Sequence, residues 1–128
     1  MTAGNPLKVI IDTDPGVDDA IAILMALASP LLEVVGLTTV GGNVPLARTT
    51  RNALALLEYA GWTDVPVAQD SPRPISGRYG YARAVHGTRG LTRRLPNPKA
   101  KPIEQTAVEF LAAQLQEFPS RITLVALG

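Results

Sequence analysis

The sequence contains no cysteine, and only 5% of its 128 residues are aromatic. The absence of cysteine excludes a disulfide scaffold and any catalysis by a thiol. No charged region precedes the first apolar run, as it would in a signal peptide, so we expect a cytoplasmic protein. The longest apolar run, residues 20–28, falls well short of the roughly 20 residues that cross a bilayer, so we expect no membrane partner.

The sequence also lacks an excess of either charge. Twelve basic and eleven acidic residues give a net charge of +1, which argues against a chain that coats nucleic acid. Hydrophobic residues make up 46% of the chain and charged residues 18%, a balance typical of a globular fold. We therefore expect one compact domain or part of one.

Acidic side chains are nevertheless concentrated at one place. Four aspartates fall within eight residues of the segment VIIDTDPGVDDAIAIL: Asp12, Asp14, Asp18 and Asp19. The β-branched residues before them predict a buried strand at 8–11, and the helix formers after them predict a helix at 20–28. Proline and glycine between the aspartates predict a tight turn.

The number of these aspartates exceeds what a helix N-terminus needs, since one cap and one acid in the first turn would satisfy it. Carboxylates this close raise one another's pKa unless a positive charge neutralises them, so we infer a bound cation. Ligands that are all oxygen atoms favour a hard cation, Ca²⁺ or Mg²⁺.

The sequence of this segment does not match two known types of acidic loop. An EF-hand loop that began at Asp12 would need an acid or amide at Gly16 and a carboxylate at Ile23. A phosphotransferase of the haloacid-dehalogenase type has Thr or Val where this sequence has Gly16.

The segment closely resembles the signature of the inosine-uridine-preferring nucleoside hydrolase family, an apolar strand followed by D-x-D-P-G-x-D-D-A, with every fixed letter present. The resemblance implies Ca²⁺-dependent hydrolysis of the N-glycosidic bond of ribonucleosides to free base and ribose. It also implies that the complete protein is a homo-oligomer, a dimer or a tetramer.

Further along, strand and helix patterns alternate. We expect strands at 34–40, 65–68 and 122–127 and helices at 46–60 and 104–117, the last with Ala107, Val108, Leu111, Ala112 and Leu115 on its buried face. Alternation of this kind predicts an α/β fold with an open, mostly parallel, doubly wound sheet of Rossmann-like type.

A long segment, about 69–102, is rich in Pro, Gly and Arg and predicts a functional or mobile loop. The last predicted strand, expected to be buried, runs to Gly128 without a helix to cover it. Because nucleoside hydrolases are longer chains, we expect residues 1–128 to be the N-terminal part of a single nucleoside hydrolase domain, with an incomplete sheet.

The family's metal and catalytic residues can be assigned to positions in this sequence. The resemblance implies that Asp14 contacts the calcium and acts as general base on a water activated by the metal, and that Asp19 is a bidentate calcium ligand. It also implies that the backbone carbonyl of Leu127 ligates calcium. Asp12, nearest the strand, is expected to accept hydrogen bonds from the turn and to orient the ligating acids.

The substrate residues follow in the same way. The resemblance implies that Asp18 holds a ribose hydroxyl and that Asn43, in VGGN, also contacts the sugar. His86 lies in an H-G-x-x-G element. The family carries such an element here with its histidine close to the nucleobase, so the resemblance implies that His86 serves in catalysis and in substrate binding. After this element the sequence reads Thr92, Arg93 and Arg94, where many relatives have a small residue.

The long loop also concentrates basic charge. Eight of the twelve basic residues lie in it: Arg73, Arg78, Arg83, Arg89, Arg93, Arg94, Lys99 and Lys101. With Tyr79 and Tyr81 they could bind single-stranded nucleic acid, but the near-neutral net charge and the closeness of the two tyrosines argue against it. A solvated loop and pairing with acids elsewhere in the protein remain the other interpretations.

Two functions of other classes stay open beside nucleoside hydrolysis. A metal-dependent phosphohydrolase would use Asp12 as a nucleophile and form a phosphorylated intermediate. A catalytically silent module would bind calcium or a ligand without turnover.

Overall fold

The computed structural model describes residues 4–78, 80 and 87–128. In chain order its elements are β1 (Leu7–Thr13), α1 (Val17–Ala28), β2 (Leu32–Thr39), α2 (Leu46–Ala60), β3 (Val67–Gln69), α4 (Ala107–Glu117) and β4 (Ile122–Ala126). All the helices and strands expected from the sequence are present, with ends that differ by up to three residues.

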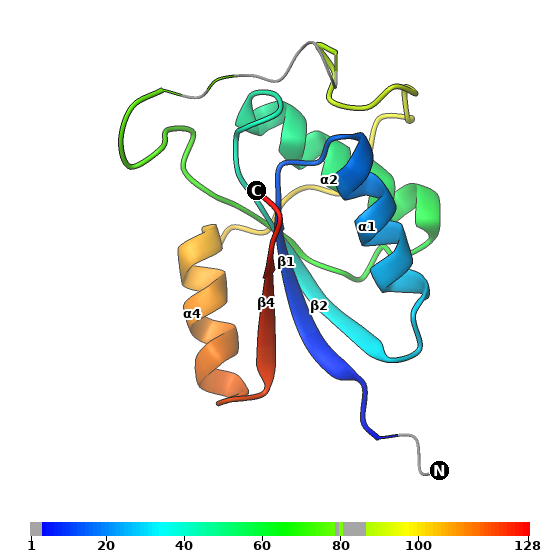
Figure 1. The fold of residues 1–128 in the computed structure, drawn as a ribbon, viewed down its shortest axis with the longest axis vertical. Coiled ribbons are helices and arrows are strands. Elements are labelled where there is room, and N and C mark those ends of the chain that lie inside the picture. The colour runs from blue at the N-terminus through cyan, green and yellow to red at the C-terminus, as the bar shows by residue number, and fades with distance from the viewer. Residues whose placement is uncertain (1–3, 79, 81–86) are drawn as a thin grey trace.

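The strands form one parallel sheet in the order β3-β2-β1-β4. Figure 1 shows α1 and α2 on one side of this sheet and α4 on the other. The predicted open, doubly wound, parallel α/β fold is therefore confirmed.

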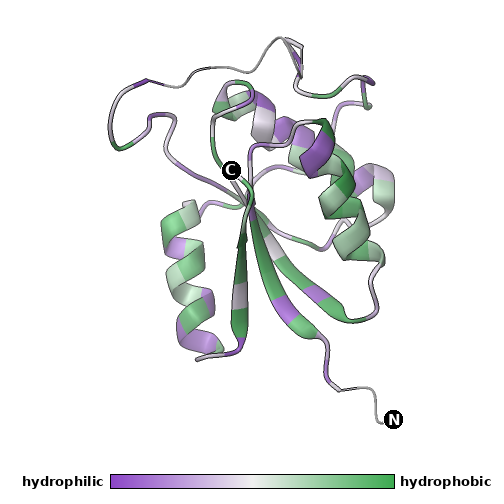
Figure 2. Cartoon of the chain, in the orientation of Figure 1, coloured by the Kyte–Doolittle hydropathy of each residue, from purple (hydrophilic) through white to green (hydrophobic). Residues whose placement is uncertain are grey.

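Alternation along β1 explains why both faces of the sheet are covered. Ile10 and Ile11 are adjacent and both fully buried, and because successive strand side chains point to opposite faces they enter different cores. Ile11 packs in the core under α1 and α2, together with Ile23 and Leu37. Ile10 packs with Ala68 and Phe110 under α4. Figure 2 shows the hydrophobic colour along much of the strands and along much of α1.

Local sequence explains where two of the helices begin and end. α2 ends at Gly61, whose φ of +79° lies in the left-handed region that glycine adopts without strain. α4 begins three residues later than expected because Thr106 caps it: Thr106 accepts from the Glu109 backbone N–H, and the Glu109 side chain accepts from the Thr106 N–H.

The structure corrects two expectations about burial. The buried face of α4 carries Ala107 and Phe110, whereas Val108 and Leu115 of the expected face are 68% and 52% exposed. The predicted buried face of this helix was rotated by about one residue, because Phe110 was not counted among its apolar positions. β4 was expected to be buried but is an edge strand, with Leu124 51% exposed.

Between β3 and α4 the described residues form no helix and no strand, as expected for the long loop, apart from one parallel bridge between Gln69 and Thr106. Within the described ranges, no helix is long and apolar enough to cross a membrane.

Candidate functional site

The carboxyl end of β1 lies where the direction of strand order changes. From β1 the chain builds β2 and β3 on one side, and it later adds β4 on the other side. The connections therefore diverge at this end, which is where open α/β sheets bind ligands. Figure 1 shows the chain's last residues, after β4, close to the end of β1.

Asp12 lies within β1 rather than in the turn. Its carboxylate accepts a hydrogen bond from the Thr38 hydroxyl of β2 at 2.6 Å. Its backbone carbonyl accepts from the N–H groups of Leu127 and Gly128 at 2.8 and 3.2 Å. Asp12 thus joins β2 to the end of β4, and its expected hydrogen bonds come from the neighbouring strand.

Burial raises the pKa of Asp12, and the negative charges of Asp70 and Asp14 raise it further, against the opposing hydrogen bond from Thr38. Asp70 follows β3, and its N–H donates to the Thr39 carbonyl. It is therefore a further carboxylate at this edge of the sheet, which the sequence pattern did not single out.

Asp14 is held by the loop that follows β2. The Asn43 backbone N–H donates to Asp14 Oδ2 at 2.7 Å, and the Asn43 side-chain Nδ2 donates to the Asp14 backbone carbonyl at 2.8 Å. A Cβ on Gly42 would overlap the Asp14 carboxylate, so only glycine lets the loop approach this closely. Asn43, assigned to the sugar by resemblance, positions Asp14 in this structure.

Asp19 is almost fully buried in the first turn of α1 and accepts a hydrogen bond from the Thr13 hydroxyl at 3.0 Å. Burial, and then the neighbouring Asp14 carboxyl, raise the pKa of Asp19 to about 6. Asp14 and Asp19 therefore form a close carboxyl pair. Asp18, one residue before Asp19, is exposed to solvent, whereas Asp19 is buried.

A calcium ion fits the chemistry of these donors. In the described part of the chain no three His, Cys, Asp or Glu side chains converge as a complete metal site. The Asp14–Asp19 pair, however, offers oxygen atoms only. Burial, and then the Asp14 carboxyl, raise the pKa of Asp19, and a divalent cation beside it would favour the ionised carboxylate. The Leu127 N–H donates to the Asp12 carbonyl, and among the described residues none donates a hydrogen bond to the Leu127 carbonyl. His86 lies outside the described residues, so its role stays a prediction.

Sequence reasoning missed Asn52 of α2. Its side chain is 2% exposed, and its Nδ2 donates to the Pro15 carbonyl at 3.3 Å and to the Arg89 carbonyl at 2.7 Å. Gly90, at φ +80°, packs so closely that a Cβ there would lie 2.9 Å from the Asn52 Nδ2. Asn52 thus links the turn that carries Asp14, Asp18 and Asp19 (residues 14–19, the aspartate turn) to the segment after His86. An amide in the middle of an apolar helix pattern was the available signal.

Comparison with known proteins identifies the family. A sequence model described as inosine-uridine preferring nucleoside hydrolase matches residues 9–128. The chain is 51% identical to uridine nucleosidase 1 of Arabidopsis thaliana, over 98% of this chain and 38% of that protein. It is 45% identical to the pyrimidine-specific ribonucleoside hydrolase RihA of Salmonella arizonae, over 95% of this chain and 40% of that protein.

Solved structures agree with the sequence comparisons. A plant nucleoside hydrolase, PpNRh1, superposes with a TM-score of 0.90 at 48% identity, over 96% of this chain and 40% of that chain. This chain spans about two fifths of the length of the curated relatives it matches. The match nevertheless includes every residue of the aspartate turn, the Asn43 loop and the end of β4, and the chain belongs to the inosine-uridine preferring nucleoside hydrolase family.

Proposed function

We propose that the full-length protein that carries this chain hydrolyses the N-glycosidic bond of pyrimidine ribonucleosides, uridine above all, to free base and ribose, with Ca²⁺ as its metal. The observation that carries this proposal is the Asp14–Asp19 carboxyl pair, held by Asn43 and Thr13 at the carboxyl end of β1. Family membership supports the reaction class.

Calcium, when bound by Asp14, Asp19 and the Leu127 carbonyl, would lower the pKa of the attacking water. Asp14 accepts the proton of that water as general base, and the Asn43 N–H keeps its carboxylate in one orientation. Asp18 is exposed at the start of α1, where it can accept a hydrogen bond from a ribose hydroxyl. The developing positive charge on the sugar is stabilised by the carboxylates around it.

Asp12 acts through its neighbours rather than on the substrate. Thr38 holds its carboxylate, and its backbone holds the end of β4, so Asp12 fixes the position of Leu127 relative to Asp14. This use of Asp12 leaves the phosphohydrolase interpretation without support, because that reaction needs a free nucleophilic aspartate at this position, and the comparisons also do not favour it.

The preference for pyrimidines rests on the names of the relatives. Uridine nucleosidase 1 and the pyrimidine-specific RihA are 51% and 45% identical to this chain. A purine-preferring ribonucleoside hydrolase from Gardnerella vaginalis has nearly the same fold, with a TM-score of 0.89, but only 30% identity. The chain is thus more similar in sequence to the pyrimidine enzymes.

Ribose release from uridine, cytidine and inosine by the full-length protein tests the proposal. We expect uridine to give the highest kcat/KM, and Asp14→Asn and Asp19→Asn each to lower it by about 10²-fold or more, since each removes charge that stabilises the transition state. Asp64→Asn, at an exposed site away from the sheet edge, is the matched control.

Metal dependence is tested separately from turnover. Calorimetry on the metal-free protein should show Ca²⁺ binding that Asp19→Asn weakens and Asp64→Asn leaves unchanged. Hydrolysis that survives complete chelation, or an Asp14→Asn variant with near wild-type turnover at saturating Ca²⁺, would contradict the assignment.

A further inference from the structure

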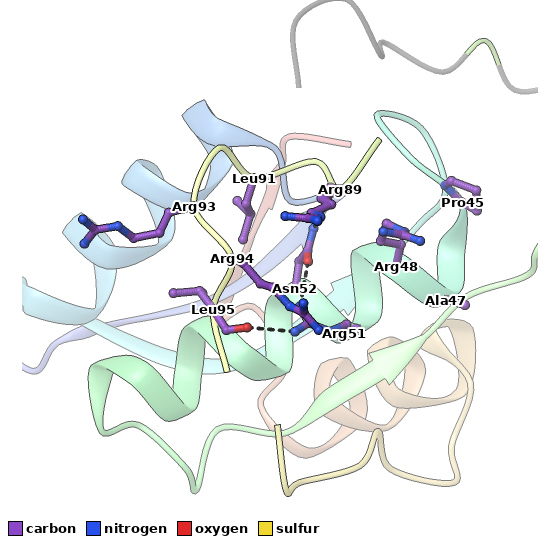
Figure 3. Close-up of a pocket in the computed structure, with 10 residues that line it drawn as sticks. All are labelled: Pro45, Ala47, Arg48, Arg51, Asn52, Arg89, Leu91, Arg93, Arg94 and Leu95. Atoms are coloured by element: carbon purple, nitrogen blue, oxygen red, sulfur yellow. Dashed lines mark hydrogen bonds between the residues drawn. The ribbon is translucent and has the colours of Figure 1, made fainter. Parts of the chain in front are cut away.

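A second polar site lies beside the aspartate turn and shares none of its carboxylates. A cavity of about 510 Å³ opens between the N-terminal half of α2 and the segment 89–95 (Figure 3). Its volume is in the range of small-molecule sites. Five of the residues that line it are arginines, and none is an acid: Arg48, Arg51, Arg89, Arg93 and Arg94.

The charges of these arginines are not neutralised within the described part of the chain. There, no carboxylate lies within 4.0 Å of any of the five guanidinium groups, and the salt bridge that does form joins Lys8 to Glu33. Arg51 does make hydrogen bonds, but to neutral acceptors, the Leu95 carbonyl at 2.9 Å and Asn97 Oδ1 at 3.0 Å. Because arginine stays protonated at any accessible pH, the cavity keeps a concentrated positive charge.

Two segments of backbone hold this charge in place. Arg48 and Arg51 lie on α2, and the bonds from Arg51 fix the chain at Leu95 and Asn97. The Arg89 backbone is fixed by the buried Asn52. In Figure 3 the Arg93 side chain points away from the other four toward α1. We call the remaining four, Arg48, Arg51, Arg89 and Arg94, the arginine pocket.

The N-terminus of α2 adds to the attraction for an anion. Pro45 is the N-cap and makes no side-chain cap, and both Pro45 and Ala47 line the cavity. The first turn of a 15-residue helix therefore faces the same space as the guanidinium groups.

We propose that the arginine pocket binds the phosphate group of a small organic phosphate, of the class of a sugar phosphate or a nucleoside monophosphate. A phosphate dianion offers enough charge and enough acceptor oxygens for several planar guanidinium forks at once. The cavity is larger than a phosphate group, and Pro45, Leu91 and Leu95 give the rest of it an apolar wall for the organic part. No aspartate of the turn lines the cavity, so the phosphate site and the Asp14–Asp19 pair use different side chains.

Calorimetry on the full-length protein, at low ionic strength, tests this proposal with four probes: inorganic phosphate, ribose 5-phosphate, uridine monophosphate and uridine. We expect both organic phosphates to bind more tightly than inorganic phosphate. Their affinity should rise between about pH 5 and 7, as the second phosphate proton is lost, and should fall with added salt.

The double variant Arg48→Gln/Arg94→Gln should weaken binding of both organic phosphates by about tenfold or more, and it should leave uridine binding unchanged. Both side chains are exposed, so the fold should survive. The matched control Lys101→Gln/Arg121→Gln removes the same charge at exposed sites away from the cavity. Should the double variant fail to fold, Arg94→Lys keeps the charge, removes the fork and should give a partial loss.

The proposal is overturned if no organic phosphate binds, if the double variant and its control bind organic phosphates equally well, or if inorganic phosphate binds as tightly as ribose 5-phosphate. Because binding is measured without turnover, these outcomes do not depend on whether the protein hydrolyses uridine.

Discussion

The two faces of the sheet are covered by buried cores of different size. Among the described residues, the face under α1 and α2 has a core of twelve buried residues, whereas the face under α4 has three. We call the layer under α1 and α2 the deep half and the layer under α4 the shallow half. The candidate site lies where these two halves meet. Asp14 and Asp19 are positioned from the deep half, and Leu127 is supplied by the shallow one. The precision of the carboxyl pair therefore rests on the better packed part of the molecule.

The largest effect should come from removing a central side chain of the deep face. Leu37→Ala should lower the free energy of unfolding by about 3 kcal/mol, because Leu37 is fully buried in β2 and its loss leaves a cavity. Leu124→Ala on the half-exposed β4 should lower it by less than about 1 kcal/mol in residues 1–128.

Urea unfolding of both variants, in residues 1–128 and in the full-length protein, measures this contrast. Equal losses in the 128-residue chain would contradict the difference in depth. A larger loss for Leu124→Ala in the longer protein would show that further chain covers β4.

A medium effect is expected at Asn52, which holds the segment at Arg89 against the aspartate turn. Asn52→Ala leaves the Pro15 and Arg89 carbonyls without their donor and should lower the free energy of unfolding by about 2 kcal/mol. It should also lower kcat for uridine more than it raises KM, since Asn52 positions the aspartate turn. Asn97→Ala, which removes an exposed acceptor of Arg51, is the control. Similar kcat and KM values for both variants would show that Asn52 does not position the aspartate turn.

A smaller effect should appear as a pH dependence of the metal-free protein. The folded pKa of Asp19, about 6, exceeds the 3.8 that is usual for an aspartate, so the folded state holds this proton more tightly than the unfolded state. Stability should therefore fall as pH rises from about 4 to 6, by up to about 2 kcal/mol. Asp19→Asn should lack this part of the slope, and saturating Ca²⁺ should suppress it. A slope identical in wild type and Asp19→Asn would assign it to other groups.

The smallest effect should come from the shallow half. Leu127 is expected to serve through its backbone carbonyl, so Leu127→Ala should change Ca²⁺ affinity by no more than about twofold. Calorimetry measures the Ca²⁺ affinity of Leu127→Ala and compares it with that of Asp19→Asn. A tenfold loss for Leu127→Ala would mean that its side chain, which is 38% exposed, organises the site.

The order of the elements and the place of the site were predictable because both follow from local patterns. β-branched runs, the Asp-Pro-Gly turn and the strand ends were visible in the sequence, and parallel strands align their carboxyl ends. The contacts that position the aspartates were not predictable in the same way. Thr38 contacts Asp12 at the end of β1, and Asn52 and Gly42 contact the turn that follows. All three come from segments that are distant along the chain, and such contacts depend on how the helices and strands pack.

Burial on the α4 side was mispredicted for a related reason. The helical period of 104–117 allows more than one apolar stripe, and the selected stripe left out Phe110, whose ring packs against Gly36 of β2. That contact becomes visible only once β2 and α4 are placed together.

The central position of β1 has a consequence for synthesis on the ribosome. One edge of β1 pairs with β2, which follows within the next few dozen residues, but Lys8 on the other edge pairs with Ile122. During translation that second edge, with its unpaired N–H and C=O groups, waits until β4 has emerged. Exposed edges of this kind recruit other strands, and late, non-local pairing slows folding. β1, the strand that leads into the aspartate turn, is therefore a part of the nascent chain that needs protection from aggregation.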